Sequence, residues 1–346
     1  MITELTIEEF LLQSKNNLTL DVRSEGEFNY GRIPHATNLP LFNNEERKTV
    51  GTIYKQQNRE EAILAGLDIA GKKMSGFIRF AQEKTQIKKV FIHCWRGGMR
   101  SGSMAWLFNQ FGFEVFVLKR GYKSYRQHVH GVLSKKFNLL VIGGKTGSGK
   151  TELLRELKKL GEQVINLEAL ANHKGSAFGA LGMPPQPSTE HFENLLAEEL
   201  KLLDEKKIIW LEDESKNIGK VFINENFWST LRQSPLFVID LPQEIRVKRL
   251  VKDYGENMEA GLEQSIRNIE KRLGNENCKN AIEALQQKNF SETARITLNY
   301  YDKAYEQGIT MKNTKEIFRL AFGKDDLKTM AEKLLQEAGK NNYGRN

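Results

Sequence analysis

The sequence predicts an α/β protein with two units, each built around a parallel sheet. Short apolar runs alternate with helical stretches from residue 1 to about residue 130, and the same alternation resumes at residue 138. In each half, a glycine-rich loop directly follows one of the apolar runs. Strands that alternate with helices pair in parallel, and a chain of 346 residues with 39% apolar content is long enough to form two cores.

In the first half, apolar runs at residues 18–22, 90–93 and 115–118 are interpreted as strands. Cys94 follows the second run and opens a loop that closes on a predicted helix over residues 101–110. Arginines, backbone N–H groups and a helix N-terminus favour the thiolate, the reactive form of cysteine. A buried, inert cysteine is the alternative, but the arginines and glycines of the loop do not suit a core. We therefore predict that Cys94 is a nucleophile and that the rest of this cysteine loop supports it, namely Trp95, Arg96, Gly97, Gly98, Met99, Arg100 and Ser101.

A basic linker over residues 119–137 connects the two halves. It carries six cations and no acid, with Tyr122, Tyr125, His128 and His130 among them. Basic groups beside stacking aromatics suit RNA, and the formal charge of +8 permits a polyanionic partner. A solvated linker is the alternative interpretation. The candidate tRNA contacts in this segment are Lys119, Arg120, Lys123, Tyr125 and Arg126.

The second half opens with an apolar run at residues 139–142 and a glycine-rich loop that matches G-x-x-x-x-G-K-[ST] at every fixed position. A helix is predicted over residues 152–157. Such a loop directs backbone N–H groups and a helix N-terminus at a bound anion, Lys150 adds a charge, and the Thr151 hydroxyl can reach Mg²⁺. The predicted phosphate-binding residues are Gly144, Gly147, Ser148, Gly149, Lys150 and Thr151. The identity of the phosphate compound stays open at this point.

Further strands are predicted at residues 164–167, 208–211 and 236–240, with mostly helical structure from residue 243. Glu212 and Asp213 follow the strand at 208–211, where a P-loop protein carries the carboxylate that holds Mg²⁺ through water, and either residue could serve with Thr151. His173 and Ser176 follow another strand and are candidate substrate or tRNA contacts. The expected domains are residues 1–130 and 138–310, followed by a charged helical region over 311–346.

The cysteine content and the N-terminal sequence predict a cytoplasmic protein. The two cysteines, Cys94 and Cys278, lie in different halves, so a disulfide framework is not expected. The sequence begins without a basic and apolar leader, and no apolar run approaches the roughly 20 residues of a membrane span. We therefore expect a soluble protein that does not associate with a membrane.

The first half resembles a rhodanese domain in residues 21–28, which include Asp21 and Arg23, in residues 31–40 and in the cysteine loop. From about residue 4 to about residue 335 the chain is similar to the tRNA 2-selenouridine synthases, which join a rhodanese domain to a P-loop domain. Besides the two loops, this similarity is carried by NNEER at 43–47, GTIYKQQ at 51–57, GYK at 121–123, HKGSAFG at 173–179 and LEDES at 211–215.

The resemblance implies that selenium replaces sulfur in a 2-thiouridine at the wobble position of Lys, Glu and Gln tRNAs. It further implies S-geranylation of the thiouridine by geranyl diphosphate, followed by exchange of geranylthiol for selenium from selenophosphate. The selenium-carrying cysteine of the family falls on Cys94, with Asp21 and Arg23 in supporting positions. Some relatives carry two adjacent cysteines there, whereas this chain has His93 and Cys94.

The cofactors and partners follow from the same resemblance. Mg²⁺ is expected, and no tightly bound organic cofactor is expected. The expected partners are tRNA and a selenophosphate-producing enzyme. Pyrophosphate leaving geranyl diphosphate would occupy the P-loop, where Lys150, Thr151 and Mg²⁺ stabilise it. A nucleoside triphosphate is the competing occupant.

Two other functions are compatible with the motifs. The spacing of Cys94 and Arg100 matches the cysteine phosphatases, so a phosphatase fused to a kinase-like P-loop domain is one alternative. A non-catalytic, nucleotide-gated RNA-binding module is the other. A phosphatase requires an aspartate general acid near its cysteine, whereas an RNA-binding module should tolerate loss of Cys94.

Overall fold

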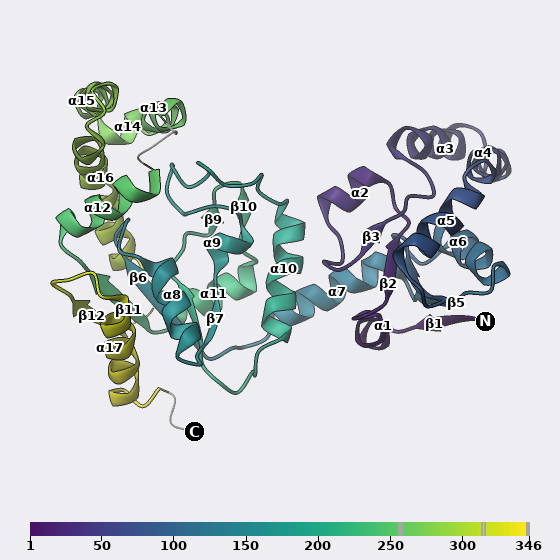
Figure 1. Ribbon diagram of the computed structural model, residues 1–346, viewed down its shortest axis with the longest axis horizontal. Helices are drawn as coiled ribbons and strands as arrows, with labels where there is room; N and C mark the ends of the chain where they lie inside the picture. Colours follow the sequence, from purple (N-terminus) through teal and green to yellow (C-terminus); the bar gives the residue numbers. More distant parts are fainter. Residues whose placement is uncertain (255–258, 313, 315, 344–346) are drawn as a thin grey trace. The chain divides into compact units, whose positions relative to one another are not determined.

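The computed structural model describes residues 1–254, 259–312, 314 and 316–343. The chain forms two compact units, Met1–Val132 and Leu133–Asn346, each with its own parallel sheet (Figure 1). The expected boundary between residues 130 and 138 includes this division. No helix in the described part of the chain combines the length and the apolar character that a bilayer crossing requires.

The sheet of the first unit has the strand order β1-β5-β4-β2-β3 and is entirely parallel. Its strands are β1 (Ile2–Leu5), β2 (Leu18–Asp21), β3 (Thr37–Asn38), β4 (Lys89–His93) and β5 (Glu114–Leu118). Its helices are α1 (Ile7–Ser14), α2 (Glu25–Tyr30), α3 (Asn44–Gln56), α4 (Arg59–Gly71), α5 (Met74–Lys84) and α6 (Met99–Gln110). Helix α7 (Gly121–Leu133) follows β5.

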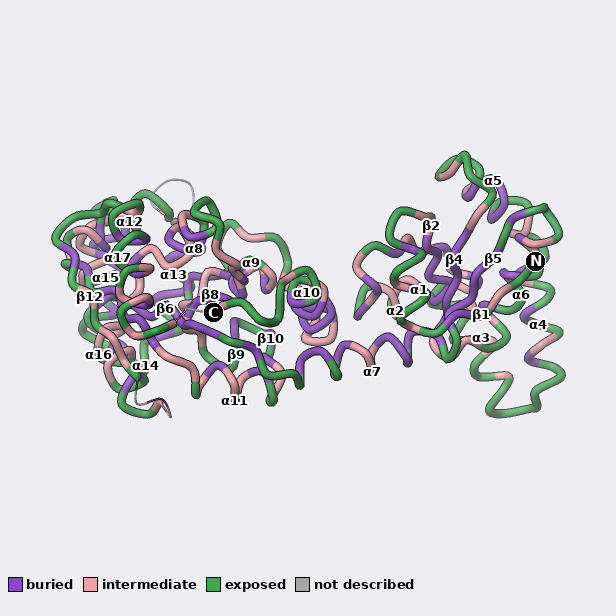
Figure 2. The backbone as a smooth tube through the Cα atoms, turned by 90° about the horizontal axis from the view of Figure 1, so that it is seen from below, coloured by how far each residue is buried: buried purple, intermediate pink, exposed green. Residues whose placement is uncertain are grey.

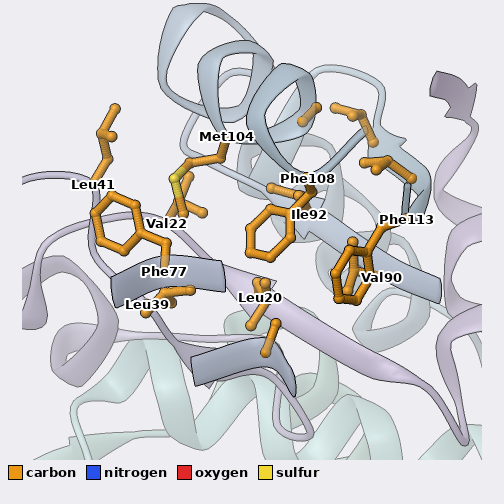
Figure 3. Packing of buried hydrophobic residues seen from close by; sticks show 14 of the residues in the cluster. Leu20, Val22, Leu39, Leu41, Phe77, Val90, Ile92, Met104, Phe108 and Phe113 are labelled. Carbon is orange, nitrogen blue, oxygen red and sulfur yellow. The ribbon is translucent and has the colours of Figure 1, made fainter. Parts of the chain in front are cut away.

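The core of the first unit lies between the sheet and the helices packed on it. Leu20 of β2, Ile92 of β4 and Phe108 of α6 meet there, and each is fully buried (Figure 3). The central strands are buried along most of their length, whereas α3 and α4 are largely exposed (Figure 2). Continuous apolar strands of this kind form because both faces of a parallel sheet are covered.

The sheet of the second unit has the order β12-β11-β6-β8-β7 and is also parallel. Its strands are β6 (Leu139–Gly144), β7 (Gln163–Ile165), β8 (Ile209–Glu212), β11 (Leu236–Asp240) and β12 (Ile317–Ala321). A short antiparallel pair comprises β9 (Asn217–Ile218) and β10 (Val221–Phe222). The helices are α8 (Lys150–Lys159), α9 (Leu167–Leu170), α10 (Thr189–Lys201), α11 (Glu225–Gln233), α12 (Gln243–Tyr254), α13 (Glu259–Asn268), α14 (Glu270–Leu273), α15 (Asn275–Gln286), α16 (Phe290–Thr310) and α17 (Leu327–Lys340).

Three of the sequence-based expectations about these elements are not met, and the short strands β1, β3, β9 and β10 were not expected. The strand expected at 164–167 ends at Ile165, because the Asn166 side chain accepts a hydrogen bond from the Ala169 N–H and starts α9. Most of the basic linker is helix α7. The C-terminal region is not only helical, since β12 pairs with β11 before α17 begins.

Candidate functional site

Cys94 lies at the carboxyl end of β4, where the chain turns into α6. Its side chain is buried, and Sγ lies 3.2 Å from Oγ of Ser101 in the first turns of that helix. The Ser101 hydroxyl also lies 3.0 Å from the carbonyl oxygen of Gly98. A hydroxyl has one proton, so Ser101 can donate either to Gly98 or to Sγ, and a negative sulfur would attract that proton.

The surroundings of Cys94 favour its thiolate form. Burial alone would raise the pKa of the thiol, but hydrogen bonds from the side chain and backbone of Ser101, the charge of Arg100 and the Arg96 N–H lower the pKa below its ordinary value. Stabilisation by N–H groups at the start of a helix is a general route to a reactive cysteine. These contacts support the predicted nucleophile.

Glu27 fixes the position of Arg100. Its carboxylate accepts from Arg100 Nη1 at 2.7 Å and from Nη2 at 3.3 Å, and Arg47 of α3 forms a second ion pair with it at 2.8 Å. Burial opposes the charge of Glu27, but the hydrogen bond from Arg100 keeps its pKa below the ordinary value. Arg100 is thus oriented by a partner that the sequence reasoning did not identify, even though Glu27 lies in the rhodanese-like stretch at 21–28.

Asp21 and Arg23 form a buried ion pair close to the loop, and Arg23 faces Trp95 and Tyr122. Nη2 of Arg23 donates to Oδ2 of Asp21 at 2.6 Å and to the carbonyl oxygen of Gly31 at 2.7 Å. The Arg23 guanidinium lies 3.8 Å from the centre of the Tyr122 ring, and the Tyr122 N–H donates to the carbonyl oxygen of Cys94 at 2.8 Å. The pair therefore supports the loop through Tyr122.

Gly121 allows α7 to approach the cysteine loop closely. A Cβ atom at this position would lie 2.3 Å from the carbonyl oxygen of Cys94 and 2.5 Å from the Gly97 nitrogen. Gly121 also has a φ of 59°, in the left-handed region that favours glycine. Because the N–H groups of Tyr122 and Lys123 bond the carbonyls of Cys94 and Trp95, the start of α7 holds the loop in place.

The basic linker contributes both exposed cations and buried rings. Lys119, Arg120 and Lys123 are exposed, and the Arg120 backbone lies against Gly97 of the cysteine loop. Tyr125 is completely buried, so the prediction that its ring contacts tRNA is wrong. It lies on the buried side of an amphipathic helix, packed against Tyr122, rather than in an exposed linker.

Within the first unit, all of which the structure describes, neither aspartate has the features of the general acid that a cysteine phosphatase requires. The carboxylate of Asp21 is bonded to Arg23, and although burial opposes its charge, His93 and Arg23 lower its pKa below the ordinary value. Asp68, the other aspartate of the first unit, is exposed on α4. A carboxylate that stays ionised cannot protonate a leaving group.

The phosphate loop of the second unit connects β6 to α8 as predicted from the motif. Gly147 and Gly149 each have a φ of 80°, so the loop uses backbone conformations that favour glycine. The Ser148 hydroxyl is buried and has no hydrogen-bond partner among the described residues. A buried polar group without a partner is uncommon, and here it lies in a loop shaped to surround an anion.

Lys150 begins α8 and is surrounded by acidic side chains. Burial would lower its pKa, but four nearby carboxylates, first Glu214 with Oε1 at 4.0 Å, raise it above the ordinary value. Burial raises the pKa of Glu212 to about 8, and burial also raises the pKa of Glu214 despite the adjacent lysine. Lys150 therefore stays charged, whereas Glu212 and Glu214 resist ionisation.

Oxygen atoms suitable for Mg²⁺ lie next to Lys150. The Thr151 hydroxyl donates to Glu168 at 2.8 Å, and Oε2 of Glu212 is buried without a hydrogen-bond partner in the described part of the chain. Asp213 is ion-paired with Lys312, which favours Glu212 over Asp213 as a metal-binding residue. In the described ranges no three His, Cys, Asp or Glu side chains form a protein-only metal centre. Mg²⁺ commonly uses one or two protein oxygens with water and phosphate, so this donor set fits it.

Two arginines of α12 lie beside the phosphate loop. Arg246 is buried, pairs with Asp302 at 2.7 and 2.8 Å, and donates to the carbonyl oxygen of Thr146 at 3.2 Å. Arg249 pairs with Asp325, and a Cβ atom at Gly149 would lie 1.7 Å from its Nη1. Arg246 therefore positions the loop, while Arg249 places a cation next to the anion site.

A cleft of about 1070 Å³ opens beside the phosphate loop and brings several predicted residues together. Lys150, Thr151, Asp213, His173 and Ser176 all line it. The cleft walls also include residues that the sequence reasoning left out of the site, namely Glu168, Glu214, Arg249, Tyr254 and Tyr301. Burial lowers the pKa of His173, which favours a neutral ring inside this wall.

The two loops and their folds define a rhodanese-like unit joined to a P-loop unit. A family model described as the tRNA 2-selenouridine synthase AAA domain matches residues 137–337, and the rhodanese-like domain model matches residues 7–128. The chain belongs to the tRNA 2-selenouridine synthase family.

Individual relatives support this membership. The tRNA 2-selenouridine synthase of Psychromonas ingrahamii is 32% identical over 336 residues, covering 88% of this chain and 91% of the relative. Relatives of the same name from Bdellovibrio bacteriovorus (40% identity, 72% of this chain, 68% of theirs) and Nitrosomonas europaea (38%, 72% and 66%) also align.

Among solved structures, the tRNA isopentenylpyrophosphate transferase of Bacillus halodurans aligns with 59% of this chain and 96% of its own, at 14% identity and a TM-score of 0.35.

Proposed function

We propose that this chain is a tRNA-modifying transferase that converts wobble 2-thiouridine to 2-selenouridine. Membership in the family supports the reaction class. The observation that carries the proposal is the presence of two chemically different loops in one chain. One favours the thiolate of Cys94, and the other presents Lys150 and backbone N–H groups to a cleft. The proposed substrates are the Lys, Glu and Gln tRNAs.

The first step of the proposed reaction is alkylation. The thiocarbonyl sulfur attacks C1 of geranyl diphosphate, the C1–O bond breaks, pyrophosphate departs with the bonding electrons, and the uridine N3 proton is lost to solvent. A thiocarbonyl sulfur is a poor leaving group as sulfide and a better one as geranylthiolate. Alkylation therefore explains why a prenyl donor would serve a reaction whose product contains no prenyl group.

In this proposal the phosphate loop stabilises the departing pyrophosphate. The backbone N–H groups, Lys150 and Arg249 provide positive charge where negative charge accumulates. Thr151 and Glu212 would hold Mg²⁺, which adds Lewis-acid stabilisation of the leaving group when bound. Arg246 keeps the loop in position through Thr146.

The second step is assigned to the rhodanese-like unit. In this step selenophosphate, water and a disulfide load Cys94 as a perselenide (Sγ–Se⁻), which releases phosphate and two thiols. The perselenide selenium attacks C2 of the geranylated uridine, the C2–S bond breaks, and geranylthiolate departs. Two thiols then reduce the Sγ–Se bond, which re-forms the disulfide, regenerates the Cys94 thiol and leaves the selenocarbonyl. Ser101 and Arg100 favour the anionic sulfur that holds selenium. Lys119, Arg120 and Lys123 are the proposed contacts for tRNA phosphates beside the cysteine loop.

The proposal predicts that two substitutions separate the steps. Cys94→Ser should still produce S-geranyl-2-thiouridine from tRNA and geranyl diphosphate, yet no selenouridine, because a hydroxyl cannot replace a thiolate as selenium carrier. Lys150→Ala should slow alkylation by roughly 10²-fold, on the scale of one preorganised electrostatic donor, and should retain conversion of pre-geranylated tRNA when selenophosphate is supplied. Mass analysis of the nucleosides measures both products.

Cys278→Ser is the matched control, because Cys278 is buried in a helical core cluster of the second unit and should leave both steps intact. Loss of geranylation in Cys94→Ser, with normal folding and tRNA binding, would place the cysteine in both steps and contradict the division. Stabilisation of the wild type by ATP and not by geranyl diphosphate would contradict the assignment of the donor.

A further inference from the structure

A second, apolar pocket lies in the helical part of the second unit. Helices α12, α13 and α16 and the turn after Ser176 form it. Its walls are largely hydrocarbon, with Phe178, Leu250, Leu262, Ala294 and Leu298 among the lining residues. In this structure its volume is about 50 Å³, whereas one ordered water requires about 10–15 Å³.

Three of the hydroxyl groups in the pocket wall have protein partners. The Thr297 hydroxyl lies 3.0 Å from the carbonyl oxygens of Thr293 and Ala294 and can donate to either, and the Thr293 hydroxyl donates to the Asn289 carbonyl at 3.1 Å. The Tyr301 hydroxyl accepts from the Ala177 N–H at 3.1 Å. Against a wall that is mostly hydrocarbon, a nucleotide base would find few partners for its polar edge, and unpaired polar groups are costly to bury, whereas a hydrocarbon needs no such partners.

The pocket adjoins the phosphate cleft, because five residues line both spaces. Thr146 of the phosphate loop and Leu250 of α12 line both spaces, as do Ser176, Tyr254 and Tyr301. A ligand whose phosphates occupy the loop can therefore extend an apolar group into the pocket. The ligand that best matches the phosphate cleft and the apolar pocket together is a phosphate ester with a branched hydrocarbon chain.

We propose that this pocket binds the far end of the prenyl chain of the diphosphate substrate and sets the chain length that the enzyme accepts. The inference rests on the proposed alkylation step and extends it by assigning the specificity site. The last isoprene unit enters the pocket, and the carbons nearer the diphosphate lie along Leu250 and Tyr254 in the shared wall. Because these carbons remain in the larger cleft, C1 stays open to attack.

The test uses the full chain, thiolated tRNA and the five-, ten- and fifteen-carbon prenyl diphosphates as separate donors. Ala294 is partly buried on α16, so Ala294→Phe should fill the pocket. The Ala294→Phe variant should lower kcat/KM for geranyl diphosphate by about 10-fold or more. Its kcat/KM for dimethylallyl diphosphate should change little, because the shorter chain does not reach the pocket. Leu262→Ala should enlarge the pocket and raise the use of farnesyl diphosphate relative to geranyl diphosphate.

Lys303→Phe is the matched control, since it adds the same ring to an exposed position of α16 outside the pocket and should leave the donor preference unchanged. Thermal stabilisation by inorganic pyrophosphate shows that the phosphate loop is intact. Ala294→Phe and Leu262→Ala should both retain this stabilisation. An unchanged chain-length preference in both variants, with a wild type that transfers geranyl, overturns the chain-end site alone. A folded wild type that transfers no prenyl group from any donor overturns the alkylation step and this inference with it.

Discussion

Cys94 and Cys278 are both buried, yet their surroundings have opposite effects on the thiol. Burial and the charge of Glu270 raise the pKa of Cys278 above its ordinary value. At Cys94, hydrogen bonds from Ser101 and the charge of Arg100 outweigh burial and lower the pKa. The difference arises from the start of α6, because only Cys94 lies where helix N–H groups and a hydroxyl converge.

Ser101→Ala should raise the pKa of Cys94. The substitution removes a hydrogen bond that stabilises the thiolate, so the protonated thiol becomes more favourable. The pKa should rise by about one unit if the bond contributes on the order of 1.5 kcal/mol. Thiolate ultraviolet absorbance against pH, in a Cys278→Ser background, measures the midpoint. Ser103→Ala, at an exposed position of the same helix, should not move it. An unchanged midpoint in Ser101→Ala would mean that the hydroxyl serves only the Gly98 carbonyl.

Single residues of the site differ in how far the sequence reveals them. Cys94 and Lys150 belong to loops whose functional residues are contiguous in the sequence, so both could be predicted. Glu168 and Glu214 approach Lys150 because β7 and β8 lie side by side and their carboxyl ends converge. Arg249 reaches Gly149 from α12, far along the chain. No local pattern encodes such approaches, so the fold was needed to find them.

At the scale of elements, the junction of β5 and α7 determines the shape of the cysteine loop. Gly121→Ala should destabilise the protein by about 2 kcal/mol or more, since it combines a left-handed backbone with a Cβ atom 2.3 Å from the Cys94 carbonyl oxygen. Denaturant unfolding of the full chain measures this, and the pKa of Cys94 should shift as the loop moves.

Gly131→Ala offers a comparison within the same helix. A Cβ atom there would meet nothing within 4 Å, so alanine should be neutral or stabilising by up to about 1 kcal/mol. If Gly121→Ala behaves like Gly131→Ala in both stability and Cys94 titration, α7 does not hold the loop in the way described.

Elements with strong local patterns were predictable, whereas two others depended on tertiary context. The strands at 18–22, 90–93, 115–118 and 236–240 appear as β2, β4, β5 and β11 within a residue or two. Strand β12 was missed because it is partly exposed and carries Arg319, so only pairing with β11 makes it a strand. The apolar residues of the basic linker have helical spacing, but its charges favoured the interpretation as an RNA-binding linker.

For the whole molecule, binding of tRNA should depend on the exposed cations beside the cysteine loop. The double variant Lys119→Ala and Lys123→Ala should weaken binding and reduce the slope of log affinity against log salt by about two, one per phosphate contact. Lys88→Ala is the control, because Lys88 is exposed but precedes β4, at the opposite end of the strand from Cys94. Unchanged affinity and slope in the double variant would move the tRNA surface elsewhere.

A ribosome reaches β12 and α17 only after every other element of the second unit has been synthesised. Until then, β11 has an unpaired edge and α8 lacks the helix that packs on it. The nascent chain would thus display an open strand edge and an apolar helix face, features that invite aggregation or chaperone binding. A message truncated before the codon for Ile317 would therefore yield a polypeptide with the complete cysteine loop and the residues that line the phosphate cleft. It would lack the edge strand and the helix that complete the sheet and the core beside the phosphate loop.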